Sequence, residues 1–186
     1  MVEVAARTLP LSGLHGGSAT VRLEPAVPAE RINLRVRAED VAALSAALGV
    51  YLPLKPKTSA SANGRTALWI GPDEWLVIAE SGGEVGSALV EAAARSGALH
   101  SATDVSHRNT AILVSGPGAA GAINVGCPQD LSLKAFPVGA CSRTIFGKVE
   151  IVLLRTAGDA FRVEVWRSFS DYAFGLLAEG ARDAAL

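Results

Sequence analysis

The sequence contains few cysteines, and their spacing matches no thiol motif. Cys127 and Cys141 are the only two among 186 residues, and they form neither a C-x-x-C pair nor a zinc-ligand pattern. Residues 1–10 also lack the charged-then-apolar pattern of a secretion signal. We therefore expect two free thiols in a cytoplasmic protein, because disulfides are rare in that compartment.

Charge clusters and long apolar runs are also missing. The net charge is −1, and Lys and Arg form no basic stripe, so a nucleic-acid partner is not expected. The longest strictly aliphatic strand run, Ala111–Val114, is far too short to cross a bilayer, so no membrane partner is expected. The sequence holds no Walker phosphate-binding motif and no G-x-S-x-G nucleophile motif, which disfavours NTPases and serine hydrolases.

What the chain does have is a surplus of apolar residues. Hydrophobic residues make up 49% of the sequence and charged residues 19%, and alanine contributes much of the excess. A chain of this length buries roughly 70% of its unfolded surface, enough for one substantial core or two small subdomains sharing one. We expect in addition an apolar patch that a partner protein covers. The alternative is an Ala-rich monomer.

Hydrophobic periodicity divides the chain into an arm and two similar halves. Residues 1–28 are rich in glycine and proline and predict an extended arm with one strand at 20–23. The half at 29–107 shows the order β-α-β-β-α-β, with elements at 32–36, 40–48, 66–70, 75–79, 84–96 and 99–105. The half at 108–186 nearly repeats it, with elements at 110–114, 117–125, 141–146, 149–155, 161–166 and 168–181.

This element order predicts an α+β fold. Two tandem split β-α-β (ferredoxin-like) halves with antiparallel sheets would form one compact domain. In the first strand of the 29–107 half, apolar Ile32, Leu34 and Val36 alternate with polar residues, which is typical of a half-buried strand. The strand at 161–166 alternates in the same way, with Arg162 and Glu164 as its polar members. In the predicted helix at 168–181, Phe169, Ala173 and Leu176 fall on one face.

A glycine-rich stretch at Gly116–Gly121 has the form G-x-G-x-x-G between a predicted strand and a predicted helix. Such glycines let a pyrophosphate approach backbone N–H groups. However, no acidic residue follows about 20 residues later, where a ribose ligand is needed. We therefore expect these glycines to serve close packing of a proline-started helix on the sheet.

His100, Asp104 and His107 lie close together in the sequence and raise the question of a metal site. Positions 100 and 104 share one face of a strand, whereas 107 falls on the other, so we expect no metal here. Ser106 beside His107 raises the question of a hydrolase, but a triad draws its members from separate elements. The simpler expectation is that Asp104 and Ser106 bond backbone N–H groups at a turn.

Several large amphipathic side chains have the composition of a protein interface. Tryptophan, tyrosine and arginine dominate the binding energy of many such interfaces. The predicted interface residues are Trp75, Arg108, Trp166, Arg167 and Tyr172. The alternative is that the tryptophans fill the edge of the core.

Asp104–His107, followed by Ser115–Pro117, resembles the start of the aminomethyltransferase (glycine-cleavage T-protein) family. The resemblance implies the folate-binding domain fold of that family. Where the family has an aspartate pair that serves tetrahydrofolate and the aminomethyl substrate, this chain has Glu150 and Ile151. An apolar side chain cannot stabilise a developing cation. The resemblance therefore implies a scaffold without the transferase chemistry, with Glu150 as the remaining folate candidate.

Four motifs together resemble the gamma subunit family of heterotetrameric sarcosine oxidase over roughly residues 30–180. They are Gly71–Leu76, Asp104–Asn109, Arg143–Lys148 and Val165–Phe169. The resemblance implies a non-catalytic structural subunit in a cytoplasmic complex with alpha, beta and delta subunits. That complex oxidises sarcosine with O2 to glycine and H2O2, and it converts tetrahydrofolate to methylenetetrahydrofolate.

The same resemblance implies where the cofactors lie. FAD, FMN and NAD are expected on the large subunits and zinc on the delta subunit, with no cofactor, metal or catalytic residue on this chain. Two other functions remain open. One is a free-standing folate-binding or aminomethyltransferase-like protein that uses Glu150, and the other is a dinucleotide-binding enzyme that uses Gly116–Gly121.

Overall fold

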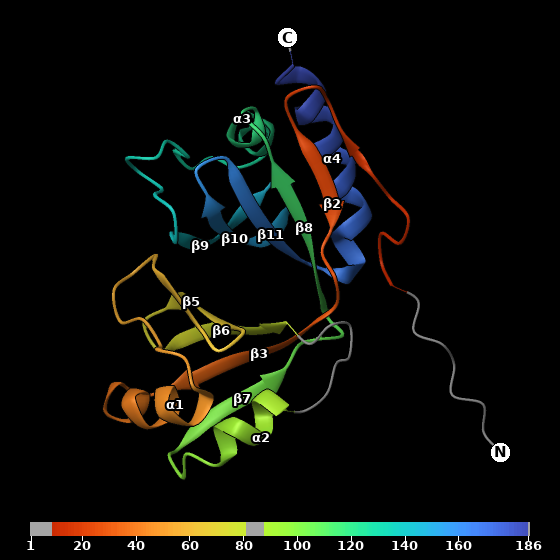
Figure 1. The fold of residues 1–186 in the computed structure, drawn as a ribbon. Helices are drawn as coiled ribbons and strands as arrows, with labels where there is room; N and C mark the ends of the chain where they lie inside the picture. Colours follow the sequence, from red (N-terminus) through yellow and green to blue (C-terminus); the bar gives the residue numbers. More distant parts are fainter. Residues whose placement is uncertain (1–8, 81–87, 186) are drawn as a thin grey trace, which may run out of the picture.

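The computed structural model describes residues 9–80 and 88–185. Two antiparallel sheets face each other, and helices cover their outer faces (Figure 1). This arrangement confirms the predicted α+β class with two antiparallel sheets. Side chains from segments far apart in the sequence meet in the space between the sheets.

The five-stranded sheet has the order β4-β5-β6-β3-β7, and all its neighbouring strands are antiparallel. Its strands are β3 (Ala29–Val36), β4 (Ser59–Ala62), β5 (Arg65–Gly71), β6 (Glu74–Glu80) and β7 (His100–Asp104). The 3-10 turn η1 (Ala38–Asp40) leads into α1 (Val41–Leu48), and α2 (Ala88–Ala94) lies beside α1. The predicted start of the second helix at 84 lies outside the described residues.

The six-stranded sheet has the order β1-β2-β8-β11-β10-β9. Its strands are β1 (Gly16–Gly17), β2 (Arg22–Pro25), β8 (Asn109–Ser115), β9 (Cys141–Phe146), β10 (Val149–Ala157) and β11 (Ala160–Trp166). Its helices are α3 (Ala119–Asn124) and α4 (Ser170–Asp183), with the 3-10 turn η2 (Arg167–Phe169) before α4.

The segment predicted as an arm contributes two strands to the second half's sheet. β2 begins two residues later than expected and pairs with β8, with Leu23 opposite Val114. The division into 1–28, 29–107 and 108–186 stays a prediction. The strands β1 and β2 of the first segment belong to the same sheet as the strands of the third segment. β4 was missed because its sequence, Ser-Ala-Ser-Ala, lacks the β-branched and aromatic residues that are typical of strands.

Three apolar clusters hold the layers together. One lies between the six-stranded sheet and α3 and α4, and a second lies between the five-stranded sheet and α1 and α2. The third lies between the two sheets and includes Ile78, Val152 and Leu154. Along β10, Ile151 and Leu153 face the helices while Val152 and Leu154 face the other sheet, so this strand is buried on both faces.

The two sheets are also joined by hydrogen bonds at one edge. Thr58 and Ala140 form an antiparallel bridge. The Cys141 N–H donates to the Lys57 carbonyl at 3.1 Å, and the Ser59 N–H donates to the Gly139 carbonyl at 3.0 Å. These contacts connect the edge strands β4 and β9, which would otherwise expose unpaired backbone groups.

A buried ion-pair network crosses the space between the sheets. Arg31 on β3 donates through Nε and Nη2 to both carboxylate oxygens of Glu164 on β11, at 2.7 and 3.2 Å. Arg162 Nε donates to the same Glu164 at 2.7 Å. The Arg31 and Glu164 side chains are only 2% and 1% exposed, so the network replaces their hydration almost completely.

We predict that Glu164→Gln lowers the free energy of unfolding more than Arg31→Met does. The first change removes the buried carboxylate that two guanidinium groups share, whereas the second keeps the pair between Arg162 and Glu164. Removing one partner of a buried ion pair typically costs about 3–5 kcal/mol. Denaturant unfolding of the two variants measures the difference.

The matched control is Arg22→Met, because Arg22 pairs with Glu24 at 2.5 Å on the surface. Exposed pairs contribute about 0–1 kcal/mol. Equally small losses in all three variants would show that the buried network does not hold the sheets together.

Candidate functional site

Trp75, predicted as an interface residue, lies in the core. Its side chain is 1% exposed and belongs to the cluster between the five-stranded sheet and its helices. The indole N–H donates to the Pro53 carbonyl at 2.8 Å, which satisfies its polar atom without a partner protein. The structure therefore corrects this prediction and removes Trp75 from the interface candidates.

The other predicted aromatic residues lie on the surface at the end of β11 and the start of α4. Trp166 and Tyr172 are 40% and 41% exposed, and Phe169 is as exposed as Trp166. Trp166 stacks on Phe169 with ring centroids 6.0 Å apart, and the Arg108 guanidinium lies 5.1 Å from the centre of the Trp166 ring. We call Arg108, Trp166, Phe169 and Tyr172 the aromatic patch.

The prediction that Phe169 shares one face of the last helix with Ala173 is wrong. Residues 167–169 form a 3-10 turn, and α4 begins at Ser170. The buried face of α4 is formed by Ala173, Phe174 and Leu177. Phe169 instead points outward, and Tyr172 lies one helical turn beyond it.

Gly147 lets Tyr172 approach the β9–β10 turn. Its φ is +58°, and an added Cβ would lie 2.3 Å from the Tyr172 hydroxyl oxygen. That hydroxyl accepts a hydrogen bond from the Lys148 N–H at 3.3 Å. The glycine in the Arg143–Lys148 motif therefore has a structural role beside the patch.

Arg167 lies between Trp166 and Phe169 in the chain. Its backbone N–H donates to the Arg108 carbonyl at 2.7 Å. Arg167 also lines a cavity of about 280 Å3 together with Leu9 and Leu14. Of the predicted interface set, the structure thus brings Arg108 and Trp166 into contact, whereas Trp75 is buried in the core and the Tyr172 hydroxyl contacts the β9–β10 turn.

Glu150, the folate candidate, is exposed on β10 opposite Ile145. It lines a cavity of about 190 Å3 that also includes Arg108 and Trp166. Glu74 in this cavity accepts hydrogen bonds from Arg143 and from Asn33, at 3.2 and 2.8 Å. The cavity therefore holds charges of both signs, and a role for Glu150 in folate binding stays a prediction.

The residues around Asp104 form a turn. Asp104 Oδ1 accepts a hydrogen bond from the Ser106 N–H at 2.8 Å, and Ser106 Oγ accepts one from the Arg31 N–H at 2.9 Å. This confirms the expected bonds to backbone N–H groups. Across residues 9–80 and 88–185, no three His, Cys, Asp or Glu side chains are grouped so as to hold a metal ion.

The G-x-G-x-x-G stretch packs against the N-terminal segment. The Gly118 N–H donates to the Thr20 carbonyl at 3.1 Å. Gly116 has a φ of +111°, and an added Cβ there would lie 2.4 Å from the Thr20 carbonyl oxygen. These glycines therefore allow the chain before β2 to lie against the start of α3, in a sheet that is antiparallel rather than doubly wound.

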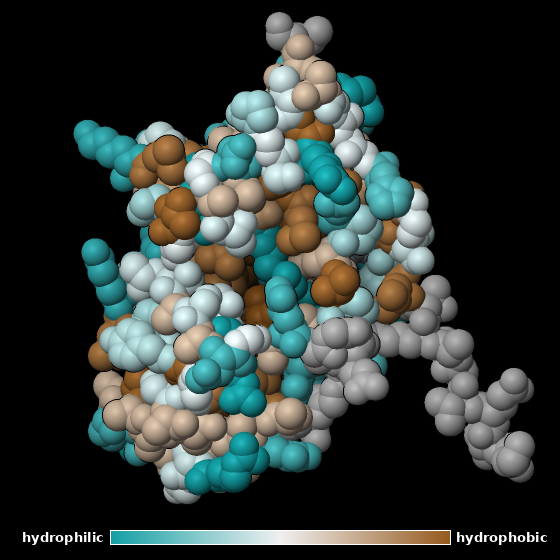
Figure 2. Space-filling view, viewed as in Figure 1, coloured by the Kyte–Doolittle hydropathy of each residue, from teal (hydrophilic) through white to brown (hydrophobic). Residues whose placement is uncertain are grey.

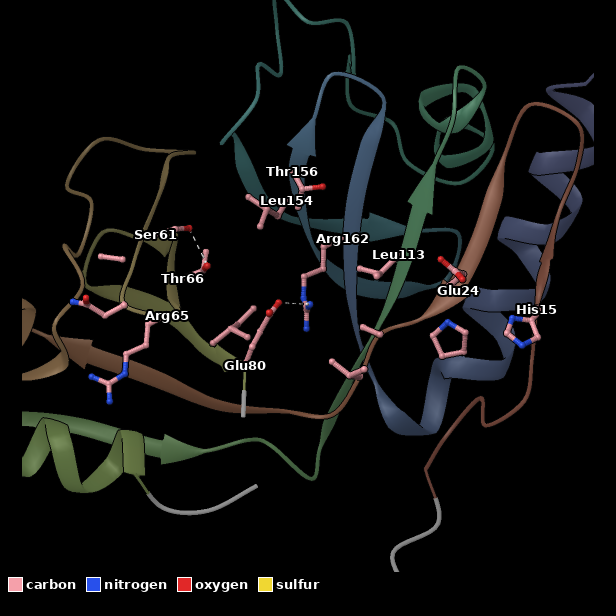
Figure 3. Close-up of a pocket in the computed structure, with 17 residues that line it drawn as sticks. His15, Glu24, Ser61, Arg65, Thr66, Glu80, Leu113, Leu154, Thr156 and Arg162 are labelled. Carbon is pink, nitrogen blue, oxygen red and sulfur yellow. Dashed lines mark hydrogen bonds and ion pairs between the residues drawn. The ribbon is translucent and has the colours of Figure 1, made fainter. Parts of the chain in front are cut away.

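A further cavity of about 740 Å3 lies between the two sheets, lined by Arg162, Glu80 and Leu113 among others (Figure 3). Sequence reasoning missed it because its walls come from strands of both sheets. The signal available in the sequence was Arg162 itself, a charged residue that alternates with apolar residues in the strand at 161–166.

Both cysteines are free and buried. The Cys141 thiol donates to the Thr58 carbonyl at 3.2 Å, and burial raises the pKa of Cys141 to about 12. Since the thiolate is the nucleophile and metal ligand, this cysteine is held in its unreactive form at the joint between the sheets.

We predict that a disulfide reagent in mildly alkaline buffer modifies neither cysteine of the native protein. Burial blocks access to both thiols, and Cys141 stays protonated because its pKa lies far above that of the buffer. Both thiols should react after unfolding in guanidinium chloride, as measured by absorbance of the released chromophore. Rapid labelling of Cys141 in the folded chain would contradict this assignment.

Comparison with known proteins gives a consistent family. Residues 36–183 match the model of the sarcosine oxidase, gamma subunit family. The chain is 36% identical over 123 residues to sarcosine oxidase subunit gamma of Arthrobacter sp., covering 66% of this chain and 60% of that protein. It is 30% identical over 171 residues to the subunit gamma of Corynebacterium sp. (strain P-1), covering 90% and 83%.

Two solved structures resemble the fold. A chain of heterotetrameric sarcosine oxidase from Corynebacterium sp. U-96, in complex with pyrrole 2-carboxylate, matches with a TM-score of 0.82 and 26% identity, over 92% of this chain and 89% of that chain. Aminomethyltransferase T from Bartonella henselae matches with a TM-score of 0.61 and 12% identity, over 89% of this chain and 50% of that chain.

In the described part of the chain, no helix has the length and apolar character needed to cross a membrane.

Proposed function

This chain belongs to the sarcosine oxidase gamma subunit family, and we propose on that basis that it is a non-catalytic structural subunit of a flavin-dependent sarcosine oxidase. The observation that carries the proposal is the match to one chain of a heterotetrameric sarcosine oxidase over 92% of this sequence. The partners would be the alpha, beta and delta subunits, and the complex would act in sarcosine catabolism in the cytoplasm.

The reaction assigned to the complex is the oxidation of sarcosine by O2 to glycine and H2O2, coupled to methylenetetrahydrofolate formation from tetrahydrofolate. FAD, FMN, NAD and tetrahydrofolate would bind to other subunits. The roles of this chain's own candidate residues support that division. Asp104 and Ser106 hold a turn, Gly116 and Gly118 pack the N-terminal segment, and Cys141 lies buried between the sheets.

The aromatic patch is the proposed contact with a larger subunit. Trp166 and Phe169 are already stacked, so docking would order few additional torsions of these two side chains. The Arg108 guanidinium over Trp166 adds a cation–π contact that strengthens when water is removed. Half-exposed aromatic rings beside an arginine are typical of interface hot spots.

We predict that Trp166→Ala weakens assembly by at least about tenfold, which corresponds to 1.4 kcal/mol. The change removes the ring on which Arg108 and Phe169 pack, yet Trp166 lies outside the three apolar clusters. The melting temperature of the isolated chain should therefore change little. Assembly is measured by titrating the tagged chain with its partner subunits and following complex formation by size-exclusion chromatography.

The matched control is Tyr51→Ala, which removes an exposed aromatic ring from the loop after α1, on the other sheet. It should leave assembly unchanged. Normal assembly of the Trp166 variant together with a large loss of thermal stability would instead identify Trp166 as a structural residue.

A free-standing folate protein is the second candidate function, because Glu150 lines a polar cavity with Arg108 and Trp166. We predict that the isolated chain neither oxidises sarcosine nor retains flavin absorbance, and that tetrahydrofolate titration gives no heat of binding. Saturable folate binding that weakens strongly in Glu150→Ala would favour the second candidate. Sarcosine oxidation by the isolated chain would rule out the structural role.

A further inference from the structure

The cavity of about 740 Å3 lies between the two sheets, and its lining combines apolar and charged side chains. In the space-filling view, hydrophobic side chains lie recessed between the upper and lower layers (Figure 2). Its volume falls within the range of sites that hold small organic ligands.

The strand register defines the two walls of this cavity. On the six-stranded sheet, Arg162 of β11 stands directly opposite Leu113 of β8 on one side and Leu154 of β10 on the other. On the five-stranded sheet, Ile78 stands opposite Thr66. Arg162 is therefore flanked by leucines on its own sheet, and the opposite wall presents Ile78 beside polar side chains such as Thr66 and Glu80.

Arg162 is incompletely satisfied. Its residue is 7% exposed, and its Nε donates to Glu164 at 2.7 Å. Its Nη1 lies 3.9 Å from Glu80 Oε1, a loose contact to a side chain that is 70% exposed. Its Nη2 is buried and has no hydrogen-bond partner among the described residues. A buried donor without a partner is costly, so this arginine retains unused capacity for an acceptor.

The buried charges around Arg162 do not balance. Arg31 and Arg162 share a single buried carboxylate, that of Glu164. Glu80 is too exposed and too distant to neutralise the remaining positive charge fully. The planar fork of an arginine matches a carboxylate, which can accept from two of its nitrogens at once.

We infer that this cavity is a binding site for a small carboxylate with an apolar body. The carboxylate accepts hydrogen bonds from Nη1 and Nη2 of Arg162 after the exposed Glu80 side chain moves aside. The apolar body contacts Leu113, Leu154 and Ile78. Figure 3 shows Arg162 extending from β11 toward Glu80, with Leu113 and Leu154 on either side of it. This site is independent of the proposed structural role.

The test uses the full-length chain and benzoate as the probe, with benzamide as its neutral match. Benzoate should shift the NMR signal of the Arg162 Nε–H group saturably, and benzamide should bind at least about tenfold more weakly, because charge-assisted hydrogen bonds to arginine are the strong ones. No saturable shift with benzoate, or equal binding of benzamide, would overturn the inference.

Two variants locate the site. Arg162→Gln should lower benzoate affinity at least about tenfold by removing the fork. Because that change also disturbs the buried network, Leu113→Glu provides a second test at a residue that is 37% exposed. It places a carboxylate directly across from Arg162, where it competes with benzoate.

The control for the second variant is Leu133→Glu, which adds the same charge at an exposed leucine in the loop before β9. Benzoate binding should be lost in Leu113→Glu and kept in Leu133→Glu. Unchanged binding in a folded Leu113→Glu variant would show that benzoate binds elsewhere and would reject the site.

Discussion

The carboxylate of Glu164, shared by Arg31 and Arg162, is the constraint on which the arrangement of the two sheets depends. Glu164 and Arg162 lie on β11, and Arg31 lies on β3 of the other sheet. A buried pair of this kind adds little net stability compared with apolar packing. Removing one partner is strongly destabilising, because the other charge then stays buried without a counter-ion. The network therefore works mainly by disfavouring every other placement of one sheet on the other.

The same face of β11 connects this network to both proposed surfaces. Residues two apart on a strand share a face, so Arg162, Glu164 and Trp166 follow one another along the space between the sheets. Arg162 opens into the large cavity, Glu164 holds the opposite sheet, and Trp166 emerges at the strand's end with 40% exposure. The two proposed sites therefore lie along one strand, with the buried Glu164 between Arg162 and Trp166.

The likeness to aminomethyltransferase T concerns the fold, at 12% identity, and a shared fold does not carry a shared function.

Sequence patterns predicted the strands, helices and turn around Asp104 because these depend on neighbouring residues. They failed for β4, whose small residues carry no strand signal. They also failed for Phe169, because the 3-10 turn before α4 changes which side chains face the core. The site was predicted only in part, since Arg108 and Trp166 come together while Trp75 lies in the core.

The sequence by itself determined the family and the order and type of the elements apart from β1, β4 and the 3-10 turns, because alternation, turn residues and motifs act over short stretches of chain. The tertiary structure alone decided which residues the second sheet covers. Arg162 and Glu164 alternate with apolar neighbours and look solvated in the sequence, yet both are buried, since the sheet that covers them supplies Arg31 from 133 positions away. Trp75 became core and Trp166 surface for the same reason: burial depends on contacts between distant segments, which local patterns do not record.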